Sequence, residues 1–261
     1  MARTAGSSVG GSRRATVDVW VAEPVDADLG PWLVHLDDVE RARVATLPSQ
    51  QASRFVQARA LLRGVLGERL GCSPQAVELH VMCPECGGTH GPVVLGAGGP
   101  YVSITRAGAL IAVAVTDDGP VGVDIESHAA VSAAPLAGVA LPRPELTAHS
   151  HRRHDARTPA LARAWVSAEA TLKAVGTGLR TDPAHLEVRS RRGRRTALAP
   201  DGTRAVLADL DLGPRLAGAV ALVPDGPVDV GPAGLNHPDR LPRLAVRLLD
   251  GGTVLTSLRG R

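Results

Sequence analysis

The stretch AGALIAVAV, from Ala107 to Val115, is echoed by RLAGAVALV, from Arg215 to Val223. Both are rich in Ala, Val and Leu, as short buried strands are. Each one follows a helical pattern, a loop and other strand-like runs in the same order. A repeated order of elements predicts an internally repeated fold. We therefore expect an α+β protein with two similar α/β halves packed about a pseudo-twofold.

The expected elements follow from apolar periodicity and from turn residues. The clearest helix runs from Ser49, as its N-cap, to Leu70, and Gly71 ends it. The turn Asp117-Asp118-Gly119-Pro120 is expected to close a hairpin. Residues 130–144 are expected to be irregular. The other expected helices are 36–47 and 160–175, and the expected strands are 16–23, 101–104, 110–115, 121–125, 186–189, 204–212 and 216–223.

The chain divides into four expected parts. Residues 1–15 lack the apolar stretch of a signal peptide and are expected to form a disordered tail. Residues 16–126 and 127–223 form the two halves, and residues 224–261 form an extension with no clear element before Leu244. No apolar run is long enough to span a membrane, so no membrane association is expected. Three cysteines in 261 residues argue against a disulfide framework and for a cytoplasmic location.

The charged residues single out one position. The chain has 29 Lys plus Arg, 26 Asp plus Glu and a net charge of +3, which favours an anionic partner. Lys173 is the one lysine; all the other basic residues are Arg. Because the compact ammonium of Lys is not interchangeable with a guanidinium, Lys173 is a candidate functional residue.

Acidic side chains occur at spacings that bring them together. Asp124 and Glu126 are two apart on an expected strand, so they share a face. Such a pair suits Mg²⁺, which prefers hard oxygen ligands, although it is also compatible with a solvated strand end. On the expected helix, Trp165, Glu169 and Lys173 follow at four-residue steps. Glu169 is a candidate third oxygen ligand and Lys173 a candidate phosphate contact, the alternative being an exposed ion pair.

Three other patterns leave alternatives open. Arg54, Arg59 and Arg63 are either a phosphate-binding helix face or a solvated one. Cys83, Cys86 and His90 fit a zinc site less well than a Gly-rich loop that faces a phosphate or cofactor, because a closed zinc site needs four ligands. The basic run 189–195 lacks the interleaved aromatic residues that stack on bases, so we expect a solvated turn and no nucleic-acid partner.

Five segments, taken in order, resemble the 4′-phosphopantetheinyl transferase superfamily, in its larger, pseudo-dimeric type that serves polyketide, nonribosomal peptide and fatty acid carrier proteins. The segments are RFVQARALLRGVL (54–66), CPECGGTHG (83–91), VSITRAG (102–108), PVGVDIE (120–126) and WVSAEATLKAVGTGL (165–179).

The resemblance implies roles for individual residues. It implies Asp124, Glu126 and Glu169 as Mg²⁺ ligands, in an active site between the two halves. Glu169 and Lys173 are the expected catalytic residues, with Lys173 also at the pyrophosphate of coenzyme A. The other residues expected to bind coenzyme A are Arg59, Arg63, His90, Thr105 and Arg106.

The implied activity is the Mg²⁺-dependent transfer of phosphopantetheine from coenzyme A to a serine of an apo acyl or peptidyl carrier protein, by a monomer. The chain departs from many relatives at Pro92 and Ala168, where they carry basic residues. A carrier-protein-binding homologue with weakened catalysis is therefore the alternative.

Overall fold

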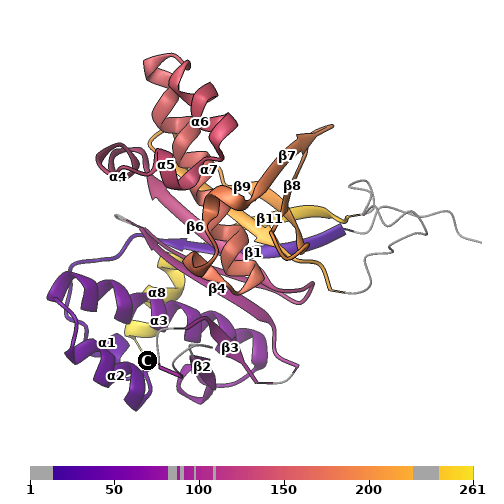
Figure 1. Cartoon of the computed structure of the whole chain (residues 1–261). Helices are drawn as coiled ribbons and strands as arrows, with labels where there is room; N and C mark the ends of the chain where they lie inside the picture. The colour runs from indigo at the N-terminus through magenta and orange to yellow at the C-terminus, as the bar shows by residue number, and fades with distance from the viewer. Residues whose placement is uncertain are drawn as a thin grey trace, which may run out of the picture.

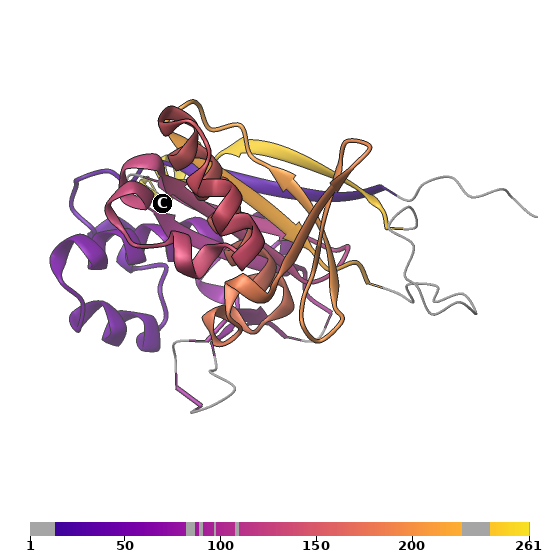
Figure 2. The ribbon, with the colours of Figure 1, turned by 45° about the horizontal axis from the view of Figure 1, so that its top comes forward.

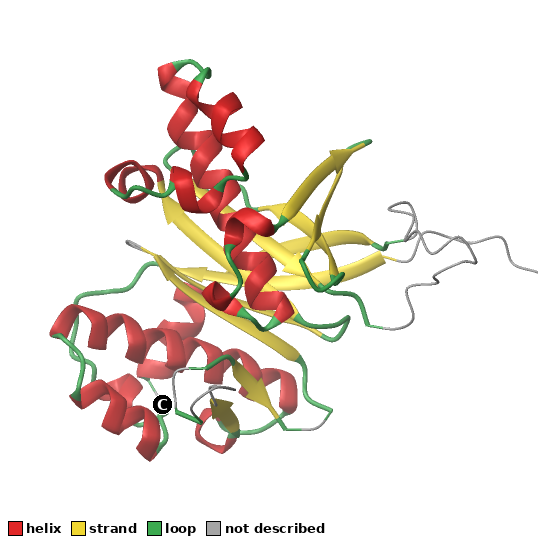
Figure 3. Cartoon of the chain, viewed as in Figure 1, coloured by secondary structure: helices red, strands yellow, loops and turns green. Residues whose placement is uncertain are grey.

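The computed structural model describes residues 14–81, 87–88, 91–96, 98–107, 110–225 and 241–260. These residues form a mixed α+β fold, as the sequence predicts, with two larger sheets at the centre and helices outside them (Figure 3). Among the described residues, no helix is long and apolar enough to cross a membrane.

The first sheet has the strand order β11-β1-β5-β4. Strand β11 runs parallel to β1, and the other neighbours are antiparallel. Helices α3 and α8 cover its outer face. The bounds are β1 (Arg14–Ala22), β4 (Tyr101–Ala107), β5 (Leu110–Thr116), β11 (Arg243–Asp250), α3 (Ser49–Leu70) and α8 (Gly251–Arg259).

The second sheet has the order β6-β10-β9-β8-β7, and the long helix α7 covers its outer face. Figure 1 shows α3 and α7 on opposite sides of the paired sheets. The bounds are β6 (Val121–Ser127), β7 (Glu187–Arg191), β8 (Arg194–Leu198), β9 (Arg204–Asp209), β10 (Leu216–Leu222) and α7 (His154–Val175).

Strand β5 shows how the layers are built. All seven of its residues are buried. Ile111, Val113 and Val115 pack toward α3, whereas the smaller Ala112 and Ala114 face the second sheet. Alternate side chains of a strand point to opposite faces, so β5 supplies two cores at once. The result is a helix–sheet–sheet–helix sandwich with apolar cores between its layers.

The two sheets share a strand order. In the first, β1-β5-β4 are antiparallel neighbours, and in the second β6-β10-β9 are arranged in the same way. The two echoing sequences form β5 and β10, the middle strand of each set. This correspondence supports the expected repeat, while its relation by a twofold axis stays a prediction.

Strand β11 and helix α8, which lie in the expected C-terminal extension, pack against the first sheet and its core. Strand β11 lies beside β1, as the yellow and indigo ribbons in Figure 2 show, and Arg247 pairs with Asp18. On α8, the carbonyl of Leu255 accepts a hydrogen bond from Trp32 Nε1 at 3.0 Å. The sequence hides this role because its partners lie more than 200 residues away.

Several expected boundaries need correction. Strand β1 begins at Arg14, so the last two residues of the expected tail are part of the sheet; residues 1–13 lie outside the described part. Helix α3 has the expected bounds and ends at Gly71 with φ of 68°, but Pro48, not Ser49, is its N-cap. Helix α7 begins at His154, before the expected start at residue 160, and it continues through Pro159.

The expected hairpin through Asp117–Pro120 is wrong. Strands β5 and β6 belong to different sheets, so this turn carries the chain from one sheet to the other. The Asp118 carboxylate accepts a hydrogen bond from Thr16 N at 2.8 Å, and a side chain at Gly119, with φ of 135°, would collide with the carbonyl of Val223. Tertiary contacts of this kind override the local turn signal.

Residues 130–144 are not irregular, because they contribute to three short helices before α7. These are α4 (His128–Ala133), α5 (Ala137–Ala140) and α6 (Arg143–Ser150). The remaining elements are α1 (Gly30–Leu33), α2 (Asp38–Ala45), β2 (Leu79–Val81), β3 (Val93–Leu95) and the 3₁₀ turns Pro74–Ala76, Gly178–Arg180 and Pro183–His185.

Candidate active site

The close approach of β6 and α7 creates the acidic part of the site. Strand β6 carries Asp124 and Glu126, and α7 carries Glu169 and Lys173. Gly122 permits this approach, because a Cβ there would lie 1.9 Å from the carbonyl oxygen of Ala170. The glycine therefore lets the helix backbone rest directly on the strand that bears the two carboxylates.

Lys173 is bonded to β6 across this contact. Its Nζ donates to Asp124 Oδ1 at 2.7 Å and to the carbonyl of Val123 at 3.1 Å, and it lies 4.0 Å from Glu169 Oε2. The Asp124 side chain is 5% exposed and that of Lys173 27% exposed. The ammonium thus bridges a buried carboxylate and the more open space beside it.

Asp124 also has a partner on the first sheet. The hydroxyl of Thr105, on β4, donates to the same Oδ1 at 2.9 Å. The other oxygen, Oδ2, is buried and has no hydrogen-bond partner among the described residues. A buried carboxylate oxygen without a partner is costly, so a position of this kind indicates a ligand or a catalytic role.

Negative charge is poorly compensated around Asp124. Burial, and then the neighbouring charges of Asp124 and Glu169, raise the pKa of Glu126 to about 7. The pKa of Glu169 is raised mainly by burial, against the attraction of Lys173. Perturbed carboxylates clustered in this way are typical of functional sites.

The donor set fits Mg²⁺ chemically, although the side chains are not arranged as a finished site. In the described ranges, no three His, Cys, Asp or Glu side chains form a group that could hold a metal ion. Asp124 Oδ2 nevertheless has no partner among the described residues, and the pKa values of Glu126 and Glu169 are raised. The three carboxylates offer hard oxygen donors, and a divalent cation would neutralise their negative charge. Lys173 contacts Asp124 in the structure.

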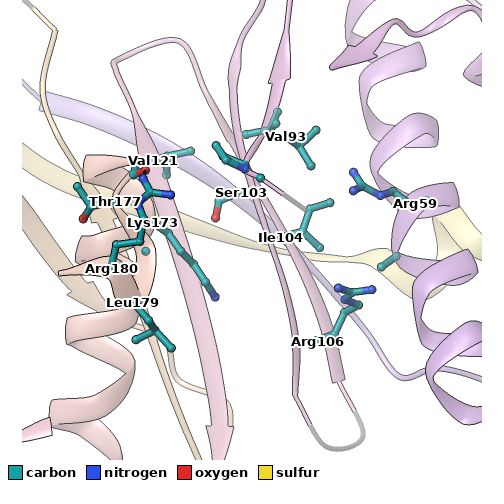
Figure 4. A pocket seen from close by; sticks show the side chains of 16 residues that line it. Arg59, Val93, Ser103, Ile104, Arg106, Val121, Lys173, Thr177, Leu179 and Arg180 are labelled. Carbon is teal, nitrogen blue, oxygen red and sulfur yellow. Dashed lines mark hydrogen bonds between the residues drawn. The ribbon is translucent and has the colours of Figure 1, made fainter. Parts of the chain in front are cut away.

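A pocket of about 570 Å³ opens next to Lys173, within the size range of small-molecule sites. Residues from both halves line it. Figure 4 shows Lys173 entering from one side and Arg59, on α3, and Arg106, on β4, from the other. The lining also includes Pro92, Ser103, Ile104, Thr177, Leu179 and Arg180.

Arg59 and Arg106 form the basic wall of the pocket. Their guanidinium carbons lie 5.3 and 5.4 Å from the centre of the Phe55 ring, so the ring holds both in place. Arg59 is also 3.5 Å from Glu40, and its buried Nη1 has no hydrogen-bond partner in the described ranges. Burial is the main cause that lowers the pKa of Arg59. An anionic group would satisfy this wall.

Arg63 does not reach the pocket. Its side chain is 1% exposed and pairs with Glu40 at 2.8 Å and with Asp37 at 2.7 Å. It also donates to the carbonyl of Val77 at 2.7 Å. Although Arg63 lies one helical turn from Arg59, these contacts make it part of the packing between α3 and α2, in place of the coenzyme A contact expected from sequence.

The other expected site residues fall in three places. Arg54 lines a smaller hollow that shares Arg59 and Arg106 with the main pocket. Thr105 lies behind the pocket, where it contacts Asp124. His90, Cys83 and Cys86 lie outside the described residues.

Sequence reasoning overlooks Thr177 and Arg180 as pocket residues, although they sit in or directly after the expected VGTGL segment. The basic run 189–195 spans the end of β7, the turn and the start of β8. Arg189 is exposed and pairs with Glu187, as expected for a solvated turn. Arg195 differs, because its side chain is 13% exposed and contacts Asp209 on β9 and Ser167 on α7.

A match to a known protein family covers the segment that carries the acidic residues and Lys173. The model of a family described as the 4′-phosphopantetheinyl transferase superfamily matches residues 120–213. No curated protein matches the chain. The matched stretch contains all of β6 and α7, and with them all three carboxylates and Lys173. The resemblance to the 4′-phosphopantetheinyl transferase superfamily is thereby confirmed over residues 120–213, whereas the larger, pseudo-dimeric type stays a prediction.

Proposed function

We propose that this chain transfers 4′-phosphopantetheine from coenzyme A to a serine of an apo acyl or peptidyl carrier protein, with Mg²⁺ as cofactor. The observation that supports this proposal best is the set of charged side chains around one pocket. Lys173 lines one side of it, and Arg59 and Arg106 line the other. Lys173 contacts Asp124 at 2.7 Å and lies 4.0 Å from Glu169, two carboxylates that do not themselves line the pocket. Phosphopantetheine transfer in general follows from the family, and the acceptor, the metal and the residue roles are our proposals.

Asp124, Glu126 and Glu169 would hold the Mg²⁺ ion. When bound, the ion would neutralise negative charge on the pyrophosphate of coenzyme A. Burial raises the pKa of Glu169, which makes its carboxylate a better proton acceptor. In the proposed step, a carboxylate oxygen of Glu169 takes the proton of the carrier serine as that serine attacks the phosphorus attached to pantetheine.

The basic side chains would bind the phosphates. Lys173 lines the pocket and lies beside the carboxylates, so its ammonium can donate to the oxygens that gain charge as adenosine 3′,5′-bisphosphate leaves. Arg59 and Arg106, braced on Phe55, would bind the phosphate groups at the adenosine end. The active site would then lie between the two halves of a monomeric, cytoplasmic enzyme.

The alternative of a carrier-binding homologue rests on Pro92 and Ala168. Ala168 is 3% exposed and packs in an apolar cluster with Leu172, Leu186 and Ala199. A charged side chain there would enter this core, so the alanine suits its surroundings and gives little support to a loss of activity. Pro92 lines the main pocket and stays the relevant departure.

Intact mass spectrometry of an apo carrier protein tests the function. The carrier is incubated with the enzyme, coenzyme A and Mg²⁺, with and without a chelator. We expect a Mg²⁺-dependent gain of one phosphopantetheine group. No gain across several unrelated carriers, beside a working control transferase, would contradict the proposal; coenzyme A binding under the same conditions would then favour the alternative.

A further inference from the structure

Two hydroxyl side chains on β4 connect the two sheets at the site. Strands β4 and β6 are edge strands of different sheets, yet they pack against each other. Ser103 Oγ accepts a hydrogen bond from the backbone N–H of Val123 at 3.1 Å, and Thr105 Oγ1 donates to Asp124 at 2.9 Å. Because residues two apart share a strand face, both hydroxyls point toward β6.

Thr105 is set apart from the pocket. It is 6% exposed and does not line the pocket, whereas Ser103, Ile104 and Arg106 do. A hydroxyl carries one proton, and that of Thr105 is donated to Asp124. Thr105 is therefore in no position to donate to a phosphate of a bound nucleotide, the role that the sequence resemblance implies for it.

The bonds to Asp124 leave one of its oxygens bare. Thr105 and Lys173 both donate to Oδ1, while Oδ2 is buried without a partner among the described residues. The two donors differ in stiffness, since Lys173 is on a long flexible stem and Thr105 is short and β-branched. If Lys173 turns toward a substrate phosphate, Thr105 remains to hold the carboxylate.

We propose that Thr105 is a positioning residue, which fixes Asp124 so that Oδ2 stays available as a metal ligand. The proposal rests on the proposed function, because it assigns Asp124 to the metal. It assigns Thr105 a role in supporting the metal site, in place of the coenzyme A contact expected from the sequence. A residue that is hydrogen-bonded to a metal ligand orients that ligand and tunes the affinity of the site for the metal.

The test compares Thr105→Val, which removes the hydroxyl at nearly constant shape, with Thr105→Ser, which keeps it. Direct titration with Mn²⁺, followed by its electron paramagnetic resonance signal, measures metal affinity without turnover. We expect Thr105→Val to weaken metal binding by about 10–100-fold, the usual effect of losing such a partner, and Thr105→Ser to restore it. The KM for coenzyme A at saturating Mg²⁺ should be unchanged.

A matched control separates this role from general destabilisation. Thr116 on β5 is 2% exposed and donates to the carbonyl of Thr16. Thr116→Val removes a comparable buried hydroxyl away from the site, so it should lower thermal stability without changing Mn²⁺ affinity. Circular dichroism confirms that each variant is folded.

The outcomes distinguish the two proposals. Wild-type metal affinity in Thr105→Val, or a rise in the KM for coenzyme A alone, would overturn the role of Thr105 and leave the function standing. A wild-type protein that binds no divalent cation, with or without coenzyme A, and modifies no carrier would overturn both.

Discussion

Two buried charged clusters in the described part of the chain differ in how well their charges are matched. Around Arg63, three nitrogens bond to Glu40, Asp37 and backbone carbonyls. Around Asp124, the carboxylates share Lys173, one oxygen is unpartnered among the described residues, and two pKa values are raised. Both clusters contain acids and bases at helical or strand spacing, so charge alone does not tell structure from function.

The comparison teaches that compensation of charge, not burial, marks the candidate site. Glu40 Oε1 also lacks a hydrogen-bond partner among the described residues, but it lies 3.5 Å from the cationic Arg59. Removing one partner of a buried ion pair lowers the free energy of unfolding, because the other charge is left buried without compensation. An unmatched cluster costs free energy in the folded protein and persists where a ligand compensates it. The two clusters should therefore respond in opposite ways to substitution, one in activity and the other in stability.

The largest expected effect comes from Glu169→Gln. Loss of the proposed general base should lower kcat by about 10²–10⁴-fold. The thermal stability should stay the same or rise, because the substitution removes a carboxyl group whose charged form is disfavoured by burial, as its raised pKa indicates. Carrier modification and a thermal melt measure the two quantities, with the exposed Glu145→Gln as control. Unchanged turnover would remove Glu169 from the mechanism.

Arg63→Met should act on stability. Removing this guanidinium leaves Glu40 buried beside fewer donors, which should cost about 3–5 kcal/mol in the free energy of unfolding. Arg41→Met is the matched control, since the Arg41–Asp38 pair is exposed and worth about 0–1 kcal/mol. Denaturant unfolding gives both values. A folded, stable Arg63→Met protein with a raised KM for coenzyme A would restore the role expected from sequence.

Lys173→Ala should cost rate more than fold. We expect kcat to fall by about 10²–10³-fold, the effect of losing one donor to a developing charge. Lys173→Arg keeps the charge on a different geometry, so it should recover only part of the rate. Single-turnover kinetics at saturating coenzyme A and Mg²⁺ check this, and full turnover in Lys173→Ala would show the assignment to be wrong.

The smallest expected effect is a pH dependence of stability without metal. Glu126 has a folded pKa of about 7, against an ordinary value of 4.5. Between these values the folded chain holds a proton that the unfolded chain releases, so this group's contribution lowers stability as pH rises through the window. Melts in chelator from pH 5 to pH 8 should show a steeper decline in the wild type than in Glu126→Gln. Equal slopes would contradict the raised pKa.

The sequence predicts the α+β class and the residues of the acidic cluster because local spacing determines both. Asp124 and Glu126 share a strand face, and Glu169 and Lys173 share a helix face, whatever packs around them. The contact that joins the two elements depends on Gly122, whose importance appears only when α7 lies on β6.

The errors have the opposite origin, since they depend on distant partners. Arg59 and Arg63 look equivalent on α3, and both contact Glu40. The contacts of Arg63 with Asp37 and with the carbonyl of Val77 distinguish them. Thr105 looks like a phosphate contact until β4 is placed against β6. The C-terminal strand has no local signal for its partner, β1, at the other end of the chain.

Calorimetric titration of Mg²⁺ into the protein mixed with coenzyme A tests the central claim most directly, with Asp124→Asn beside the wild type. Asp18→Asn serves as control, because Asp18 is a buried aspartate that pairs with Arg247 on the first sheet. We predict Mg²⁺ binding in the wild type and in Asp18→Asn, and a loss in Asp124→Asn beyond the roughly 10–100-fold typical of outer partners. Equal Mg²⁺ affinity in all three proteins would contradict the account.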